Sequence, residues 1–302
     1  MIAVDLDGTL LNSQKRISDR DREALQAAVA RGVEIVPVTG RNYAFALPVI
    51  QTLPFAVPLI SSNGAVIRSR QGETLFRRLL PVETATKILQ ATREFRPYTV
   101  VMYDQMGPGL LRIEAVPNGT SIPAGIPAGD SPYSNGVAGS LWVQRNPSLV
   151  RFVISLEEDL EADPLEVMFA GPATVIRELA ARLESGLPVS PLTGSAPAAE
   201  PAAKEFRSLL TEYLEPDFSI LDVIGGECSK GHALEYWSRE HGIAPAEIMA
   251  VGDNFNDLEM LRFAGLPVVM GNADELLKQE GWAVTLDCDS GGVAQAIQRY
   301  VL

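Results

Sequence analysis

A short apolar run at the start of the chain leads directly into an acidic turn. Ile2 to Val4 is apolar and rich in β-branched residues, and Gly8 ends the pattern, which predicts a buried strand. Asp5 and Asp7 follow, and on an extended backbone residues two apart project to the same side. Two adjacent carboxylates stay ionised at low cost only when a cation lies between them, and a hard dication such as Mg²⁺ meets that need. By itself the pattern is equally consistent with a solvated loop.

The length and composition indicate a globular protein with room for two domains. The chain has 302 residues, of which 46% are hydrophobic and 21% are charged. No apolar run approaches the roughly 18 residues of a membrane span, and no basic segment precedes a cleavable apolar stretch, so we expect a cytoplasmic location. Two cysteines and two histidines are too few for a disulfide framework, a zinc site or a histidine-based mechanism.

The net charge makes nucleic acid an unexpected partner. The formal charge is −13 at pH 7, so a polyanion would be repelled overall. A small anionic ligand would need a locally electropositive pocket, built from a metal ion, a lysine and backbone N–H groups.

Strands and helices alternate through the first eighty residues. A capped helix is expected over residues 18–31, with Leu25, Ala28 and Val29 facing inward, and a strand over 33–38. Another helix begins near Asn42, a third strand lies near 59–60, and a hairpin spans 65–78. This alternation predicts a doubly wound parallel sheet.

The pattern changes after Pro81 and resumes after the strand near 218–223. We therefore expect an inserted α+β domain over 82–222, within an α/β domain formed by 1–81 and 223–302. The elements expected in the insertion are helices over 82–95, 172–183 and 202–214, strands over 99–103, 110–114, 165–169 and 218–223, and a Gly/Pro-rich loop over 117–147 that contains Trp142.

Several polar segments lie where strands end or helices begin. They are the Asp5/Asp7 pair, Thr39-Gly40, Lys230, and the segment from Gly252 to Asp257. Open α/β sheets bind ligands at the carboxyl ends of their strands, so the fold would bring these segments to one crevice.

In spacing and order, these segments resemble the four motifs of the haloacid dehalogenase superfamily, most of whose members are phosphatases. Ser61-Ser-Asn-Gly-Ala65, Ser229-Lys-Gly-His-Ala-Leu234 and Met270-Gly-Asn-Ala273 are similar to its Cof-like branch, whose class IIB cap domain is inserted between the second and third motifs. The resemblance covers residues 1–80 and 225–302. The insertion matches only by position, although Asp222 stands where relatives often carry an acidic residue.

The resemblance implies a role for each motif. Asp5 would be the nucleophile that forms an aspartyl-phosphate, and Asp7 would protonate the leaving oxygen and then accept a proton from water. Asp253 would complete a Mg²⁺ site with Asp5 and the carbonyl of Asp7. Asp257 would orient Lys230 or metal-bound water. The remaining residues assigned by the resemblance are Leu6, Thr39, Gly40, Lys230 and Asn256 for phosphate or substrate, and Asn63 as a supporting residue.

The expected function is a Mg²⁺-dependent phosphatase for a small phosphorylated metabolite, with a sugar phosphate as the first choice. A phosphotransferase or phosphomutase and a catalytically silent ligand-binding protein remain alternatives. We expect a monomer or homodimer without a membrane or nucleic-acid partner. The sequence does not identify the substrate.

Overall fold

The computed structural model describes residues 1–115, 136–137, 140–184, 205–213 and 217–302. The chain forms two compact units, Met1–Arg78 with Cys228–Leu302 (the core unit) and Leu79–Glu227 (the cap unit). The second junction lies beyond the expected one at 222 because the last strand of the cap unit continues to Gly225. In the described ranges, no helix is both long enough and apolar enough to cross a membrane.

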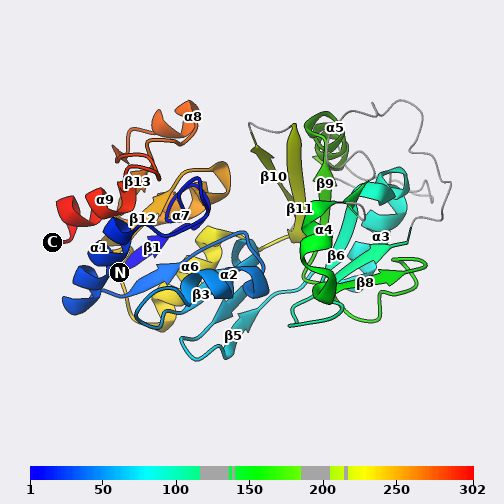
Figure 1. Cartoon of the computed structure of the whole chain (residues 1–302), viewed down its shortest axis with the longest axis horizontal. Coiled ribbons are helices and arrows are strands. Elements are labelled where there is room, and N and C mark those ends of the chain that lie inside the picture. Colours follow the sequence, from blue (N-terminus) through cyan, green and yellow to red (C-terminus); the bar gives the residue numbers. More distant parts are fainter. Residues whose placement is uncertain (116–135, 138–139, 185–204, 214–216) are drawn as a thin grey trace, which may run out of the picture. The chain divides into compact units, whose positions relative to one another are not determined.

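The core unit contains the expected parallel sheet, in the order β14-β13-β12-β1-β2 (Figure 1). Its strands are β1 (Ile2–Val4), β2 (Ile35–Pro37), β12 (Met249–Gly252), β13 (Leu266–Val269) and β14 (Ala283–Val284). Its helices are α1 (Asp19–Ala30), α2 (Tyr43–Ile50), α6 (Lys230–Glu240), α7 (Leu258–Phe263), α8 (Glu275–Lys278) and α9 (Gly292–Tyr300).

Helices cover both faces of this sheet. Ile2 and Val4 pack in one hydrophobic cluster with residues of α1 and α9, whereas Ala3 packs in another with residues of α6 and α7. The alternation follows from the two-residue period of a strand. All of β1 is buried, which explains why it reads as a continuous apolar run.

Residues 59–78 form a separate small antiparallel sheet. Its strands are β3 (Leu59–Ser61), β4 (Val66–Arg68) and β5 (Thr74–Arg77). The strand expected near 59–60 is present as β3, but its regular pairing is with β4. One isolated parallel bridge, between Val38 directly after β2 and Ile60 in β3, connects this small sheet to the main sheet.

The cap unit has a mixed sheet in the order β10-β11-β9-β6-β7-β8. Its strands are β6 (Thr99–Met102), β7 (Leu111–Glu114), β8 (Val150–Val153), β9 (Glu166–Gly171), β10 (Phe206–Tyr213) and β11 (Phe218–Gly225), and its helices are α3 (Val82–Ala91), α4 (Leu141–Arg145) and α5 (Ala173–Glu184). One face packs against α3 and α5 in a single hydrophobic cluster. The mixed sheet with helices agrees with the expected α+β class.

Three expectations for the cap unit need correction. The helix expected over 202–214 is wrong, because Phe206–Tyr213 is strand β10 and pairs with β11 along its whole length. Strand β8 was missed. The loop expected over 117–147 contains helix α4, while its residues 116–135 and 138–139 and the side chain of Trp142 lie outside the described part.

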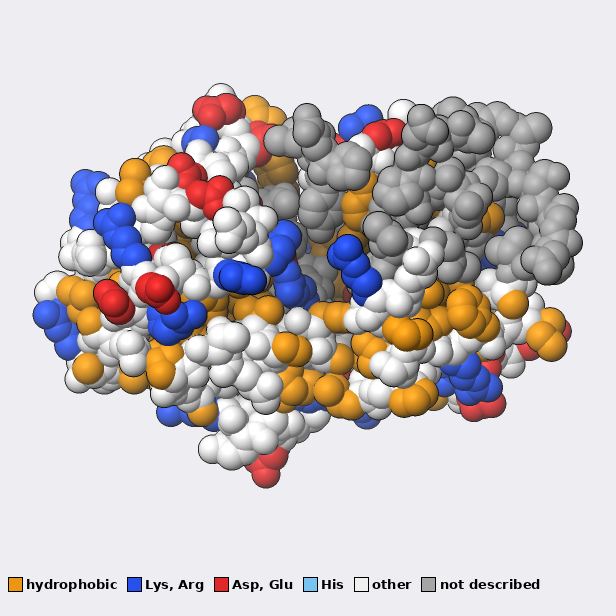
Figure 2. Space-filling view, viewed as in Figure 1, with side chains coloured by type: hydrophobic (Ala, Val, Ile, Leu, Met, Phe, Trp, Pro, Cys, Tyr) orange, Lys and Arg blue, Asp and Glu red, His pale blue; other side chains and the backbone are white. Residues whose placement is uncertain are grey.

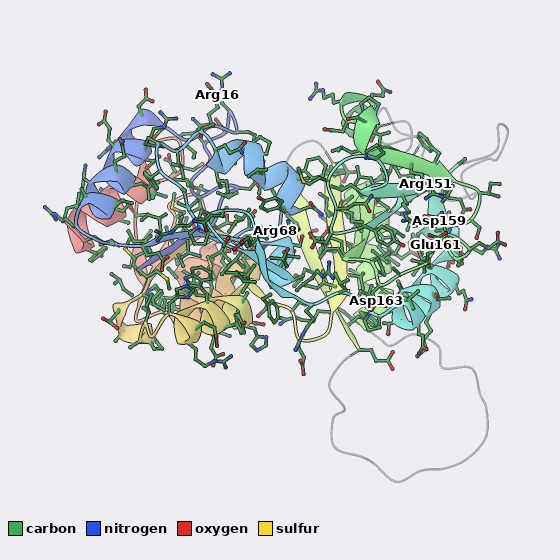
Figure 3. The ribbon with its side chains drawn as sticks, turned by 90° about the horizontal axis from the view of Figure 1, so that it is seen from below. Arg16, Arg68, Arg151, Asp159, Glu161 and Asp163 are labelled. Atoms are coloured by element: carbon green, nitrogen blue, oxygen red, sulfur yellow. The ribbon has the colours of Figure 1, made fainter. Side chains whose placement is uncertain are left out.

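Strand β8 is the edge of the cap sheet. Arg151 on β8 and Arg112 on β7 both contact the Asp159 carboxylate, at 3.1 and 2.5 Å, and Figure 3 shows Arg151 near Asp159. Phe152 and Ile154 are 53% and 91% exposed, and Figure 2 shows hydrophobic side chains at the surface in the region where Figure 1 labels β8.

Asp21 links the first helix of the core unit to the last. Ser18 caps α1 by accepting a hydrogen bond from the Asp21 N–H, and the Asp21 carboxylate accepts from the Ser18 hydroxyl at 2.6 Å and the Ala294 N–H at 2.8 Å. Asp21 is 1% exposed. Of the residues expected to face inward, Leu25 and Ala28 are buried, but Val29 is 36% exposed.

Replacing Asp21 by alanine should lower the free energy of unfolding by about 1–3 kcal/mol, because the buried Ala294 N–H loses its acceptor. Chemical denaturation measures this change. The matched control is Glu23→Ala at an exposed position of the same helix, where the expected change is within about 0.5 kcal/mol. Equal losses in the two variants would contradict this role of Asp21.

Candidate active site

Lys230 lies buried between two aspartates of the core unit. Its Nζ donates hydrogen bonds to Asp5 Oδ1 at 2.7 Å and Asp257 Oδ1 at 2.6 Å. Lys230 is 1% exposed and both carboxylates are buried. Asp5 follows β1, Lys230 is the first residue of α6, and Asp257 precedes α7. The parallel sheet thus brings together residues separated by 225 positions.

Burial and charge act in opposite directions on these groups. Burial would lower the pKa of Lys230, but Asp257 and Asp5 outweigh it and the pKa is raised, so the ammonium stays charged. Burial raises the pKa of Asp5 well above its usual value, and the carboxylates of Asp257 and Asp253 add to the effect although Lys230 opposes it. The site therefore has more negative charge than one lysine neutralises.

The described residues contain a cluster that is suited to a metal ion. Carboxylate oxygens of Asp5, Asp253 and Asp257 all lie within 4.8 Å of one another. The Thr9 hydroxyl donates to Asp253 Oδ1 at 2.9 Å and fixes that carboxylate. Burial, followed by the neighbouring Asp257, raises the pKa of Asp253 to about 7. Oxygen donors that repel one another in this way fit a hard dication.

Asp257 also organises the loop after β12. Its Oδ2 accepts the N–H groups of Asp253 at 3.0 Å and Asn254 at 3.1 Å, while its Oδ1 binds Lys230. Asp257 thus contacts Lys230, which it was expected to orient. Both oxygens of Asp257 therefore already accept hydrogen bonds.

The Asp7 carboxylate binds cationic side chains. It accepts from Arg41 Nε at 2.5 Å, Arg41 Nη2 at 2.7 Å and Lys15 Nζ at 2.9 Å. Burial alone would raise the pKa of Asp7, but Arg41 and Lys15 outweigh it and the pKa is lowered. The expectation that one cation lies between the Asp5 and Asp7 carboxylates assumed an extended backbone. The strand instead ends at Val4 and the chain turns.

Gly8 permits that turn. Its φ is +80°, and a Cβ at this position would collide with the Asp253 carboxylate. The Gly8 carbonyl accepts a hydrogen bond from Asn272 Nδ2 at 2.8 Å.

The sequence did not assign four residues that lie at the site, namely Arg41, Lys15, Thr9 and Asn272. Asn272 lies within the segment Met270–Ala273 and Arg41 directly follows Thr39-Gly40, whereas nothing in the sequence pattern singles out Lys15.

The segment after β2 interlocks with the turn after β3. The Asn63 N–H donates to the Thr39 carbonyl at 3.0 Å, and Asn256 Nδ2 donates to Asn63 Oδ1 at 3.1 Å. A Cβ on Gly40 would lie 3.0 Å from Asn63 Oδ1, so a larger residue would crowd this contact. The structure therefore brings Thr39, Gly40, Asn63 and Asn256 together. The Leu6 side chain is fully buried in the hydrophobic core.

Comparisons with known proteins agree with this arrangement. The family model for haloacid dehalogenase-like hydrolases matches residues 2–111 and 192–297. The chain is 30% identical over 305 residues to phosphatase YwpJ of Bacillus subtilis, covering 99% of this chain and 98% of that protein. It is 27% identical over 306 residues to the pyridoxal phosphate phosphatase YbhA of Escherichia coli, covering 100% and 98% of the two chains.

A solved structure shares the fold. A haloacid dehalogenase subclass IIB sugar phosphatase superposes with a TM-score of 0.68 at 21% identity, covering 99% of this chain and 98% of the other. The Cof-like branch expected from the motifs is confirmed. The chain belongs to the family of haloacid dehalogenase-like hydrolases.

Proposed function

We propose that the chain is a Mg²⁺-dependent phosphatase that hydrolyses a small phosphorylated metabolite through an aspartyl-phosphate at Asp5. The observation that carries the proposal is the buried Lys230, bound to Asp5 within a cluster of carboxylates. A fixed cation beside a nucleophilic carboxylate is the arrangement that phosphoryl transfer requires, because negative charge must be neutralised as the phosphoryl group approaches.

Asp5 takes the phosphoryl group in the proposed first step. One Asp5 carboxylate oxygen forms a bond to phosphorus as the bond between phosphorus and the ester oxygen breaks. The leaving oxygen receives a proton from Asp7. In the second step water attacks phosphorus and gives a proton to Asp7, and the Asp5 carboxylate is released with inorganic phosphate.

Asp5 and Asp253 are the side chains proposed to hold Mg²⁺, together with the Asp7 carbonyl that the family resemblance implies. A bound Mg²⁺ would neutralise phosphate charge and offset the repulsion between these carboxylates. Thr39, Gly40 and Asn256 are proposed to bind phosphate oxygens. The contacts that join Thr39, Asn63 and Asn256 support this assignment because they preorganise the turn.

Asp7 needs a proton for its proposed acid role, whereas Arg41 and Lys15 keep it ionised in the structure. Phosphate oxygens compete with a carboxylate for the same cations. We propose that an arriving phosphate draws Arg41 and Lys15 away from Asp7, so that the pKa of Asp7 rises when substrate is bound.

The proposed substrate class is a small phosphate ester, with sugar phosphates as the first group to test. The pyridoxal phosphate phosphatase among the relatives supports small phosphorylated metabolites in general. A cytoplasmic location and a monomeric or homodimeric state belong to the same proposal.

Replacing Asp5 by asparagine should reduce phosphate release at least about 1,000-fold, because the amide is not a nucleophile toward phosphorus. A panel of sugar phosphates and other metabolite phosphates, assayed with Mg²⁺, measures the change. Circular dichroism checks that the variant is folded. Asp19→Asn, with a side chain that is 89% exposed, is the control and should keep full activity. An active, folded Asp5→Asn enzyme would exclude this mechanism.

The apparent affinity for Mg²⁺ should weaken as the pH falls below about 7, because Asp253 then binds a proton that competes with the metal ion. The expected change is up to about tenfold per pH unit for one competing proton. Mg²⁺ titrations of phosphate release between about pH 6 and 8 measure it, and chelation should abolish release. A pH-independent Mg²⁺ requirement would argue against Asp253 as a ligand.

Replacing Arg41 by methionine should raise the pKa of Asp7 and lower kcat/KM at least about tenfold, because both Asp7 and the phosphate lose a bidentate cation. The pH profile of kcat/KM, which reports the free enzyme, should move to higher pH. Lys15→Met should have a smaller effect because the Lys15 side chain is 57% exposed. An unchanged profile in Arg41→Met would show that Arg41 does not control the protonation of Asp7.

A further inference from the structure

Two acidic residues of the cap sheet lie on the face opposite α3 and α5. Glu166 and Met168 lie two residues apart on β9, and Asp222 of β11 pairs with Met168. Residues two apart in a strand share a face, so both carboxylates project from the same side of the sheet. The alternate residues, Val167 and Leu221 among them, pack in the hydrophobic cluster that includes α3 and α5.

Glu166 is buried without an adequate partner. It is 2% exposed, and its Oε2 has no hydrogen-bond partner in the part of the chain that the structure describes. Burial, and then the charge of Asp222, raises the pKa of Glu166 well above its usual value. A buried carboxyl oxygen without a hydrogen bond costs free energy, so folding alone does not explain why a glutamate stands at this position.

The surroundings favour an organic cation over a metal ion. The strand neighbours of the two carboxylates on this face are Met102, Met168 and Leu209, which offer no oxygen ligands. Mg²⁺ and Ca²⁺ need about six or more oxygens, and even with waters they would be in contact with apolar side chains. An alkylammonium group instead needs a few acceptors for its N–H groups and an apolar environment for its carbon atoms, which flexible methionines provide.

Arg207 is the cation that the described strands place on this face. On β10, Arg207 lies opposite Ile224 and two residues before Leu209, which pairs with Asp222. Among the described strand residues of this face, one arginine stands against two carboxyl groups, so ionisation of both leaves one negative charge. A cationic ligand would complete the neutralisation.

We propose that Glu166 and Asp222 form a subsite of the cap unit that binds a protonated primary amino group. The amine is either part of the phosphorylated substrate, in which case the inference rests on the proposed function, or a separate small molecule. Its N–H groups donate to the carboxylate oxygens, and its carbon atoms pack against the methionines.

The first arm compares two substrates that differ by one group, glucosamine 6-phosphate and glucose 6-phosphate. If the substrate carries the amine, kcat/KM should be about tenfold higher for the amino compound, the size expected for one charge-assisted hydrogen bond. This ratio should fall to about one in Glu166→Gln. Glu178→Gln, at an exposed position of α5, removes the same charge and should keep the ratio.

The second arm measures binding without turnover by calorimetric titration. The wild type and Glu166→Gln are titrated with butylamine. The Asp5→Asn variant is titrated with both sugar phosphates. Butylamine should bind the wild type at least about tenfold more tightly than Glu166→Gln. If glucosamine 6-phosphate is not preferred over glucose 6-phosphate as well, the result supports a separate amine. Asp222→Asn repeats both arms if Glu166→Gln does not fold. No amino preference in either arm and no butylamine binding would overturn the inference. If the wild type releases no phosphate from any substrate, the result counts against the proposed function. The titrations would then show by themselves whether the subsite binds an amine.

Discussion

A buried lysine held between two aspartates is the interaction on which the site depends. The ammonium of Lys230 contacts Asp5 at the end of β1 and Asp257 after β12, so it ties together three distant segments of the core unit. At 1% exposure it would be unstable as a cation without those carboxylates. Removing one partner from such a buried pair typically costs about 3–5 kcal/mol. The proposed chemistry and the stability of the core unit therefore rest on the same contacts.

Other features of the site follow from this excess of buried acid. Asp5, Asp253 and Asp257 repel one another, and one lysine does not compensate them fully. A dication would supply the positive charge that offsets this repulsion, and it would also attract an anionic phosphoryl group. Asp7, by contrast, is already paired with Arg41 and Lys15, which outweigh the effect of burial and lower its pKa.

The sequence predicted the core unit well because its strands are short, apolar and followed directly by polar motifs. Parallel strands end at one edge, so the order of the motifs was enough to predict that Asp5, Lys230 and Asp253 meet. The partners of Asp7 were not predicted, because they depend on how the chain turns after β1, where Gly8 has a positive φ. A side-chain contact of that kind is set by local backbone geometry.

The cap unit was harder to predict because its strands are defined by distant pairing. Residues 206–213 have no strong period of their own, and only the alignment with Phe218–Gly225 makes them a strand. Glu166 reads in the sequence as a surface residue, since glutamate is seldom buried, and its position next to Asp222 follows from the register of β9 and β11.

The most direct test of the central claim is to stop turnover with acid and search by mass spectrometry for a phosphorylated peptide that contains Asp5. Acyl phosphates survive brief exposure to acid, so an intermediate that accumulates during turnover can be detected. The account predicts phosphate on Asp5, formed only with Mg²⁺ and absent from the Asp5→Asn variant. Turnover that proceeds with inversion of configuration at phosphorus, and without a phosphorylated Asp5 peptide, would contradict it, because a single displacement by water would then carry the reaction.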